Sequence, residues 1–374
     1  MISFNSNDLH PTKLLISKAA LFNNVKVYRD SLNPQTKIML MIKAFGYGTG
    51  DVELAKILEK EGLIDYFGVA YVNEGITLRE EGITTPIMVM NTGVINLEKV
   101  IAFNLEPTIY NPDQLAALIH INPNDISRIA AHIKIDSGMH RLGFSKKEIG
   151  EVVFTLLEHE VKVVGAYTHL ASSPESYHDD FTEEQINYFD ESYNLLSDKL
   201  GYKPVRHVLN SAGILRFADR QYEMVRAGMG IYGIDPSNTQ QDRFKPISRF
   251  VTRISQINKL NAGDTVGYVR KGKIDKDGTL IAVLPVGYAD GYKRSWSNGN
   301  AKVYINGKLA PTIGNVCMDM IFVDVTGIEC SIGDEVELFG PQINIQALAE
   351  KANTIDYEVM TSIGSRVVRE YQED

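Results

Sequence analysis

Several polar residues that could do chemistry stand where apolar runs of this sequence end. Lys43 ends one such run, Asn210 and Ser211 follow a later one, and Arg226 and Gly228 end another. A lysine amine can form a Schiff base with a carbonyl group if burial or a nearby cation lowers its pKa from about 10.4. Hydroxyl, amide and backbone N–H donors can hold a phosphate without a basic patch. A pocket with both features suggests pyridoxal phosphate as its ligand.

The elements that must position these residues form a repeating pattern. Short apolar runs alternate with amphipathic segments of helical spacing up to about residue 235. We interpret eight of the runs as strands, at 37–44, 65–70, 86–91, 105–110, 129–136, 161–170, 205–210 and 223–228. Continuous apolar runs are typical of strands buried on both faces, and eight strand-then-helix units favour a closed (β/α)8 barrel, the TIM barrel. Functional groups of such barrels lie at the carboxyl ends of the strands, where the polar residues stand.

The pattern changes after about residue 245. Short strands alternate with turn sequences such as NAGD, DKDG and NGK, and this texture predicts an all-β domain with one helix over 345–353. We therefore predict an α/β barrel domain over 12–245 and a C-terminal β domain over 246–374. The run KLLISK precedes the first barrel unit, so residues 1–18 are expected to pack with the β domain.

Composition limits the class of protein. The 374 residues carry a formal net charge of −9, which offers no basic face to a nucleic acid. No uncharged apolar run reaches the roughly 18 residues of a membrane span, and the N-terminus lacks the pattern of a secretory signal. The two cysteines do not suggest a disulfide framework. We expect a cytoplasmic protein with no nucleic-acid or membrane partner and no metal site.

Nine strings of this sequence resemble the alanine racemase family, in the family's order and across both predicted domains. They are MIKAFGYGTG, KIDSGMHRLGF, YTHLA, LNSAGI, MVRAGMGIYG, VGYVRKG, PVGYADGYKR, GNVCMDM and DYEVMTSIGSRVVREY. The family fold, a pyridoxal-phosphate barrel followed by a β domain, agrees with the pattern described above. The resemblance implies interconversion of L- and D-alanine, and so a supply of D-alanine for peptidoglycan.

The resemblance also implies two catalytic bases. Lys43 matches the lysine that binds pyridoxal phosphate as an aldimine, and Tyr268 matches a tyrosine that reaches the site from the other subunit. Racemisation through an external aldimine needs one base on each face of the planar carbanion, so that one removes the α proton and the other returns one. The functional unit is therefore expected to be a homodimer with shared active sites.

Other matches imply further roles. Arg226 matches the arginine that donates to the pyridine nitrogen, and His169 matches a histidine beside the cofactor. The phosphate-binding matches are Tyr47, Ser211, Gly228, Met229 and Tyr357, and Asn210 completes the cofactor-binding set. For the substrate, Arg141 and Met318 match groups near its carboxylate, while Tyr288 matches an entrance residue. Lys134 matches a lysine that is often carbamylated to hold the arginine.

Alternatives remain open at this point. A racemase of serine or of another amino acid would use the same scaffold, and a non-catalytic carrier of pyridoxal phosphate would share the barrel and Lys43. Val269, Arg270 and Lys271 depart from the commoner family pattern, which leaves the entrance shape open. Such variants resemble racemase halves of bifunctional chains that begin with a cell-wall peptide ligase, and a free-standing enzyme is equally compatible.

Overall fold

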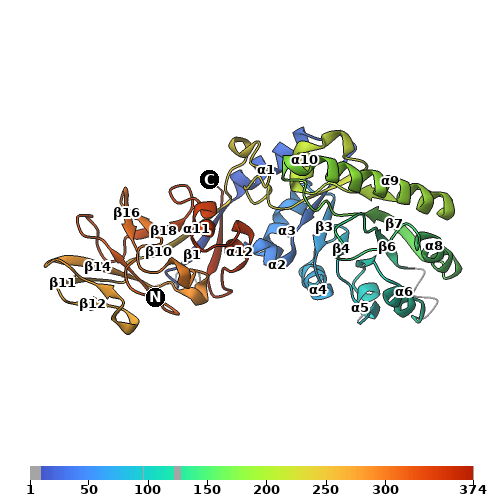
Figure 1. The fold of residues 1–374 in the computed structure, drawn as a ribbon. Coiled ribbons are helices and arrows are strands. Elements are labelled where there is room, and N and C mark those ends of the chain that lie inside the picture. Colours follow the sequence, from blue (N-terminus) through green and yellow to red (C-terminus); the bar gives the residue numbers. More distant parts are fainter. Residues whose placement is uncertain (1–9, 96, 122–127, 374) are drawn as a thin grey trace. The chain divides into compact units, whose positions relative to one another are not determined.

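The computed structural model describes residues 10–95, 97–121 and 128–373. They divide into two compact units (Figure 1). The barrel unit contains residues 21–46 and the described residues of 50–245. The β unit contains residues 10–20, 47–49 and 246–373. Both ends of the described chain and a short loop from its first part therefore belong to the β unit.

Eight parallel strands in one sheet form the centre of the barrel unit. In chain order they are β2 (Lys37–Met41), β3 (Tyr66–Val69), β4 (Ile87–Val89), β5 (Glu106–Ile109), β6 (Ala130–Lys134), β7 (Lys162–Tyr167), β8 (Val205–His207) and β9 (Met224–Ala227). The strand order is β8-β7-β6-β5-β4-β3-β2-β9. The two ends of this sheet meet where the N–H of Arg226, in β9, donates to the carbonyl of Leu209 at 2.9 Å. The predicted (β/α)8 barrel is confirmed.

Helices alternate with the strands of the barrel unit along the chain (Figure 1). They are α1 (Lys18–Asp30), α3 (Asp51–Lys60), α4 (Val72–Glu80), α5 (Leu97–Ala102), α6 (Pro112–Ile119), α8 (Ile149–Glu158), α9 (Asp179–Leu200) and α10 (Ser211–Arg216). In α9 the buried stripe contains Ile186, Phe189, Tyr193 and Leu196, which repeat at helical spacing. Gly201 then ends α9 with a left-handed φ of 77°, a common helix stop. Within the described residues, no helix is long and apolar enough to cross a membrane.

The β unit is built almost entirely from short strands. They are β1 (Lys13–Ser17), β10 (Ser248–Arg253), β11 (Gln256–Leu260), β12 (Thr265–Val266), β13 (Gly272–Lys273), β14 (Thr279–Leu284), β15 (Lys302–Ile305), β16 (Lys308–Pro311), β17 (Ile321–Asp324), β18 (Glu335–Phe339) and β19 (Val368–Gln372). They form a six-stranded, a three-stranded and a two-stranded sheet. The predicted all-β C-terminal domain is confirmed as a fold.

Two features of the β unit bear on the sequence interpretation. Strand β1 lies between β10, to which it is antiparallel, and β19, to which it is parallel. Of the N-terminal segment expected to pack here, residues 1–9 lie outside the described part of the chain. Helix α11 (Ile345–Lys351) matches the predicted helix, whereas α12 (Asp356–Thr361) was not predicted. Six residues are too few to show a helical period.

The segment that follows β2 has an unusual backbone. In α2 (Lys43–Tyr47), Ala44, Phe45 and Gly46 all have left-handed φ and ψ, and Tyr47 also has a positive φ of 52°. A left-handed residue other than glycine costs about 1–2 kcal/mol. Glu74 supports the turn, because its Oε1 accepts a hydrogen bond of 2.7 Å from the N–H of Ala44. The strain is thus localised in the residues directly after Lys43.

The loop leaves this turn at Gly48, which no other residue could replace without strain. Its φ is +86°, and a Cβ built on it would lie 2.2 Å from the carbonyl oxygen of Met360 in α12. Arg369 in β19 donates to the carbonyl oxygen of Gly48 from Nε at 3.0 Å and from Nη2 at 2.8 Å. These contacts fix residues 47–49 in the β unit.

We predict that Gly48→Ala lowers the free energy of unfolding by at least about 3 kcal/mol, because a main-chain carbonyl must move as well as the left-handed backbone. Gly62→Ala is the matched control, since Gly62 also has a positive φ, 62°, but nothing lies within 4 Å of its added Cβ. That control should cost about 1–2 kcal/mol. Thermal unfolding followed by circular dichroism measures both, and equal midpoints would contradict the prediction.

Candidate active site

Lys43 lies directly after the carboxyl end of β2, on the face of the barrel where strands lead into loops. Its side chain is half-buried. Burial lowers the pKa of its amine, and the nearby charges of Arg141 and Arg226 lower it further, against the opposing effect of Glu74. A larger share of the amine is therefore neutral, and so nucleophilic, than in a lysine in water.

Arg226 lies inside the barrel, with 2% of its surface exposed. Its Nη2 donates to the carbonyl oxygens of Thr168 at 2.7 Å and Val208 at 3.1 Å, and its Nη1 donates to the carbonyl of His207. The hydrogen bonds of its side chain to other described residues all leave from Nη1 and Nη2. Among the described residues, its Nε–H is left for another acceptor.

His169 follows β7 and contacts the same arginine, with Nδ1 at 3.5 Å from Nη2 of Arg226. Burial, the charge of Arg226 and that of Lys134 hold the pKa of its imidazole well below the usual range. The ring is therefore neutral at pH 7. Because Arg226 can only donate, Nδ1 accepts, and the proton of the neutral ring is on Nε2.

Lys134 and Arg141 lie at and after the end of β6. Only 6% of Lys134 is exposed, and its Nζ lies 2.9 Å from the carbonyl oxygen of Ile135 and 3.4 Å from Oγ1 of Thr168. Burial and the charge of Arg226 lower the pKa of Lys134 to about 7. Arg141 is exposed, and the described part of the chain gives its guanidinium no hydrogen bond or ion pair.

The predicted phosphate donors of the barrel unit lie where β8 and β9 end. The hydroxyl oxygen of Ser211 accepts a hydrogen bond of 2.8 Å from the N–H of Gly228, and Met229 is buried. Asn210 uses its side-chain oxygen to cap α10, where it accepts from the N–H of Gly213 at 3.0 Å. The structure thus brings Ser211 and Gly228 together and gives Asn210 a role in holding the loop.

Tyr47 and Tyr357 belong to the β unit, and their rings are 6.1 Å apart. Burial raises the pKa of both hydroxyls, and Asp356 raises that of Tyr357 further. Both phenols therefore stay protonated at neutral pH and are available as hydrogen-bond donors.

Tyr268, Tyr288 and Met318 line one cavity of about 780 Å³ in the β unit. Tyr268 is 72% exposed, and the next residue, Val269, is 88% exposed with a left-handed φ of 59°. The loop around Met318 is held by the ion pairs that Arg366 makes with Asp319 and with Asp290, both at 2.6 Å. Three of the sequence-predicted residues are thus brought together on one open surface.

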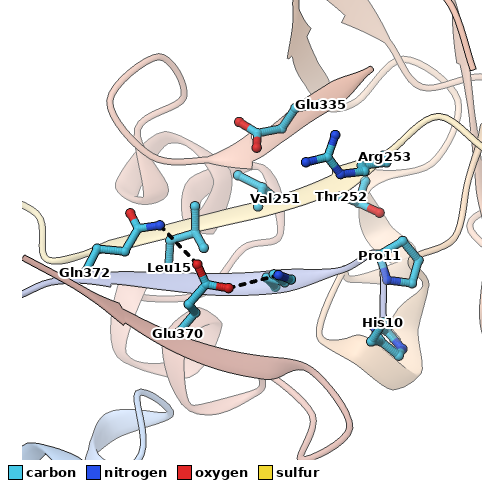
Figure 2. A pocket seen from close by; sticks show the side chains of 10 residues that line it. His10, Pro11, Leu15, Val251, Thr252, Arg253, Glu335, Glu370 and Gln372 are labelled. Carbon is cyan, nitrogen blue, oxygen red and sulfur yellow. Dashed lines mark hydrogen bonds and ion pairs between the residues drawn. The ribbon is translucent and has the colours of Figure 1, made fainter. Parts of the chain in front are cut away.

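A second cavity of the β unit, of about 420 Å³, contains none of the predicted residues (Figure 2). Several of its charged groups have partners: Lys13 pairs with Glu370 at 2.9 Å, Glu335 pairs with Arg249, and Arg253 donates to the carbonyl oxygen of Gly333 at 2.9 Å. The first of these pairs lies between the neighbouring strands β1 and β19. We therefore assign this second cavity no part in the candidate active site.

Sequence reasoning did not find every residue around Lys43 and Arg226. Glu74 lies inside an amphipathic segment, and His132, Tyr167 and His207 lie inside strands, where nothing in the apolar pattern marks them. The ring of Tyr167 lies under both cations, 5.1 Å from the guanidinium carbon of Arg226 and 5.2 Å from Nζ of Lys134. No group of three or more metal-binding side chains occurs within the ranges described.

Comparisons with known proteins agree along the whole chain. Residues 16–236 match the family model "Alanine racemase, N-terminal domain", and residues 247–371 match "Alanine racemase, C-terminal domain". Alanine racemase 1 of Caldanaerobacter subterraneus is 35% identical over 97% of this chain and 95% of its own length. The alanine racemase of Carboxydothermus hydrogenoformans is 37% identical over 90% and 93%.

Solved structures give the same answer. The alanine racemase of Clostridium difficile 630 superposes with a TM-score of 0.89 at 35% identity, covering 97% of this chain and 96% of that one. The enzyme from E. faecalis superposes with a TM-score of 0.87 at 32% identity, covering 97% and 98%. The chain belongs to the alanine racemase family.

Proposed function

We propose that this chain is an alanine racemase that interconverts L-alanine and D-alanine and so provides D-alanine for peptidoglycan. The observation that carries the proposal is the match to curated alanine racemases over nearly the full length of both chains, at about 35% identity. The half-buried amine of Lys43 at the carboxyl end of a barrel strand supports it independently. No observation favours serine or a non-catalytic role over this assignment.

The donors of the barrel unit fit pyridoxal phosphate as the cofactor. When bound, it supplies a ring that takes up the negative charge left on the substrate Cα after proton loss. Lys43 would hold its aldehyde carbon, since the lowered pKa leaves part of the amine neutral. The open Nε–H of Arg226 would donate to the pyridine nitrogen, because Nη1 and Nη2 are already engaged.

The phosphate would be held by neutral donors instead of by cations. Ser211 and the backbone N–H groups of Gly228 and Met229 are our proposed donors in the barrel unit, with the phosphate taking the place of Ser211 Oγ as the acceptor of the Gly228 N–H. The protonated hydroxyls of Tyr47 and Tyr357 are further candidates, on the basis of the family resemblance. This set suits a protein whose net charge is −9, because anion binding then depends on oriented N–H and O–H dipoles.

Lys43 and Tyr268 are our proposed pair of bases. An arginine next to the pyridine nitrogen keeps that nitrogen unprotonated, since a guanidinium hardly gives up its proton. With Arg226 as its partner, the bound cofactor would supply less charge stabilisation, so well-placed bases matter more for proton transfer on each face of the substrate. The exposure of Tyr268 and of its neighbour Val269 supports a contact with a second subunit, and we propose a homodimer.

Replacing either base should change α-proton exchange in a different way. In deuterium oxide, Lys43→Ala should abolish conversion of L-alanine. Tyr268→Phe should slow removal of the α proton from one enantiomer by about 10²–10⁴-fold and affect the other less. Proton NMR of both enantiomers measures this. Tyr177→Phe is the matched control, with a tyrosine of similar exposure, 76%, that is not among the proposed site residues. Equal loss for both enantiomers would contradict the assignment of opposite bases.

Mixing two inactive variants tests whether the sites are shared. If each site takes Lys43 from one subunit and Tyr268 from the other, mixed dimers of Lys43→Ala and Tyr268→Phe chains contain one intact site each. Random reassembly should then restore about a quarter of the wild-type activity. A mixture that stays at the level of the separate variants, while sedimentation shows that subunits have exchanged, would show that each site is built within one chain.

Lys134 should react with carbon dioxide in a pH-dependent way. With a pKa of about 7, its amine loses its proton as the pH rises from 6 to 8, and the neutral amine forms a carbamate with release of one proton. That carboxylate would offer the exposed Arg141 a partner. After equilibration with ¹³C-bicarbonate, we expect a carbamate carbon signal that grows with pH and is absent in Lys134→Arg. A signal that persists in the variant would refute it.

A further inference from the structure

A chain of hydrogen-bonded polar side chains runs through the barrel interior behind Arg226. Oε2 of Glu106 lies 2.7 Å from Nε2 of His132, whose Nδ1 lies 3.0 Å from Nε2 of His207. Nδ1 of His207 lies 3.2 Å from Nη1 of Arg226. Barrel interiors are usually filled by branched aliphatic side chains, so a polar chain of this length needs an explanation.

The groups that can donate or accept give each hydrogen bond from Arg226 to Glu106 a single direction. Arg226 can only donate, so Nδ1 of His207 accepts and carries no proton. Burial, and the neighbouring His132 and Arg226, hold the pKa of His207 well below the usual range, so this ring is neutral with its proton on Nε2. That proton is donated to Nδ1 of His132. The Nε2–H of His132 is then free to donate to the carboxylate of Glu106, which can only accept.

The surrounding residues make room for this arrangement. A Cβ added to Gly165 in β7 would lie 2.2 Å from Nδ1 of His132 and 3.2 Å from Nε2 of His207. The ring of Tyr167 stacks on His207 with 4.8 Å between centroids, and Tyr66 meets His132 edge-on. The two imidazoles are therefore held between a glycine gap and two aromatic rings.

This row of hydrogen-bonded side chains also compensates the buried positive charge of Arg226. In the described part of the protein, Arg226 makes no ion pair, and its direct partners are carbonyl oxygens and imidazole nitrogens. Glu106 is the first residue of β5, at the end of the strand away from the proposed site, while Arg226 is near the end of β9. Two polarisable rings thus connect a carboxylate at one end of the barrel to a guanidinium at the other.

We propose that Glu106, His132 and His207 form a positioning relay that fixes the orientation of Arg226 and weakens its positive field. This rests on the proposed function, in which the Nε–H of Arg226 faces the pyridine nitrogen. The relay lets a carboxylate counter the guanidinium without occupying space at the site. Without the carboxylate of Glu106, Arg226 would donate more strongly to the pyridine nitrogen, and the bound cofactor would stabilise negative charge better. That change would favour side reactions over return of a proton to the substrate Cα.

The first test uses the protein without cofactor, so it does not depend on activity. ¹⁵N NMR of histidine-labelled protein should show the proton on Nε2 and not on Nδ1 in both His132 and His207, with His132→Phe and His207→Phe providing the assignments. Gly165→Ala should disturb both signals if it folds. A proton on Nδ1 of either ring in the wild type would overturn the relay.

The second test uses the enzyme loaded with pyridoxal phosphate. Glu106→Gln keeps an acceptor for His132 but removes the charge, and we expect a shifted cofactor absorption band and kcat reduced about tenfold with KM for alanine little changed. We also expect more pyruvate per turnover, with an equal amount of pyridoxamine phosphate, because this side reaction passes the amino group of alanine to the cofactor and takes the carbonyl oxygen of pyruvate from water. Glu158→Gln, at an exposed glutamate that ends α8, is the control.

The two tests separate the relay from the function on which it rests. An unchanged band and unchanged pyruvate release in Glu106→Gln would mean that the histidines are only structural, and would overturn the proposal. A wild-type protein that does not racemise alanine would instead refute the proposed function. The histidine tautomers of the first test would then still be decided on their own.

Discussion

The burial of one guanidinium constrains much of the barrel unit. Arg226 has almost no contact with water, so the surrounding backbone must supply the acceptors that water would have supplied. The carbonyl oxygens of Thr168, His207 and Val208 do so, and they stand at the ends of the neighbouring strands β7 and β8. The N–H of the same residue joins the two ends of the eight-stranded sheet. Arg226 therefore both closes the barrel, through its backbone N–H, and fixes the carboxyl ends of β7 and β8, through its side chain.

The electrostatics around this arginine follow from the same burial. Burial lowers the pKa of Lys43, Lys134 and His169, and the charge of Arg226 inside the barrel lowers each of these pKa values further. The pKa of Lys134 falls to about 7, the imidazole of His169 is neutral at pH 7, and a larger share of the Lys43 amine is neutral than in a lysine exposed to water. Nucleophilic and proton-accepting groups are thus produced by position and not by residue type.

The sequence predicts the architecture well because the barrel depends on burial. Strands such as 37–44 and 161–170 are continuous apolar runs, and the structure contains β2 and β7 within them. The left-handed turn after Lys43 could not be predicted, since Ala44, Phe45 and Tyr47 ordinarily avoid positive φ. Local backbone hydrogen bonds, such as that from Gly46 to Ile42, and the tertiary contact of Glu74 maintain it.

The sequence pattern predicts fewer of the site residues than of the strands and helices. Lys43, Ser211 and Arg226 could be found because they interrupt or end apolar runs, whereas roles for Arg141, Tyr268 and Met318 came from family resemblance. His132 and His207 lie within strands, and no local signal distinguishes them from residues that merely fill the core. Their significance depends on distances between strands remote in sequence, which a pattern of polar and apolar letters does not contain.

The position of β1 has a consequence for biosynthesis. Strand β1 precedes all other described strands in the chain. It pairs with β10 on one side and with β19, the last strand of the described chain, on the other. Contacts between such distant segments are slow to form, and chains emerge from the ribosome N-terminus first. The β unit therefore stays incomplete until β19, which ends at Gln372, has been made, whereas all eight barrel strands are available by residue 227. The fold orders its own assembly, barrel first and β sheet last.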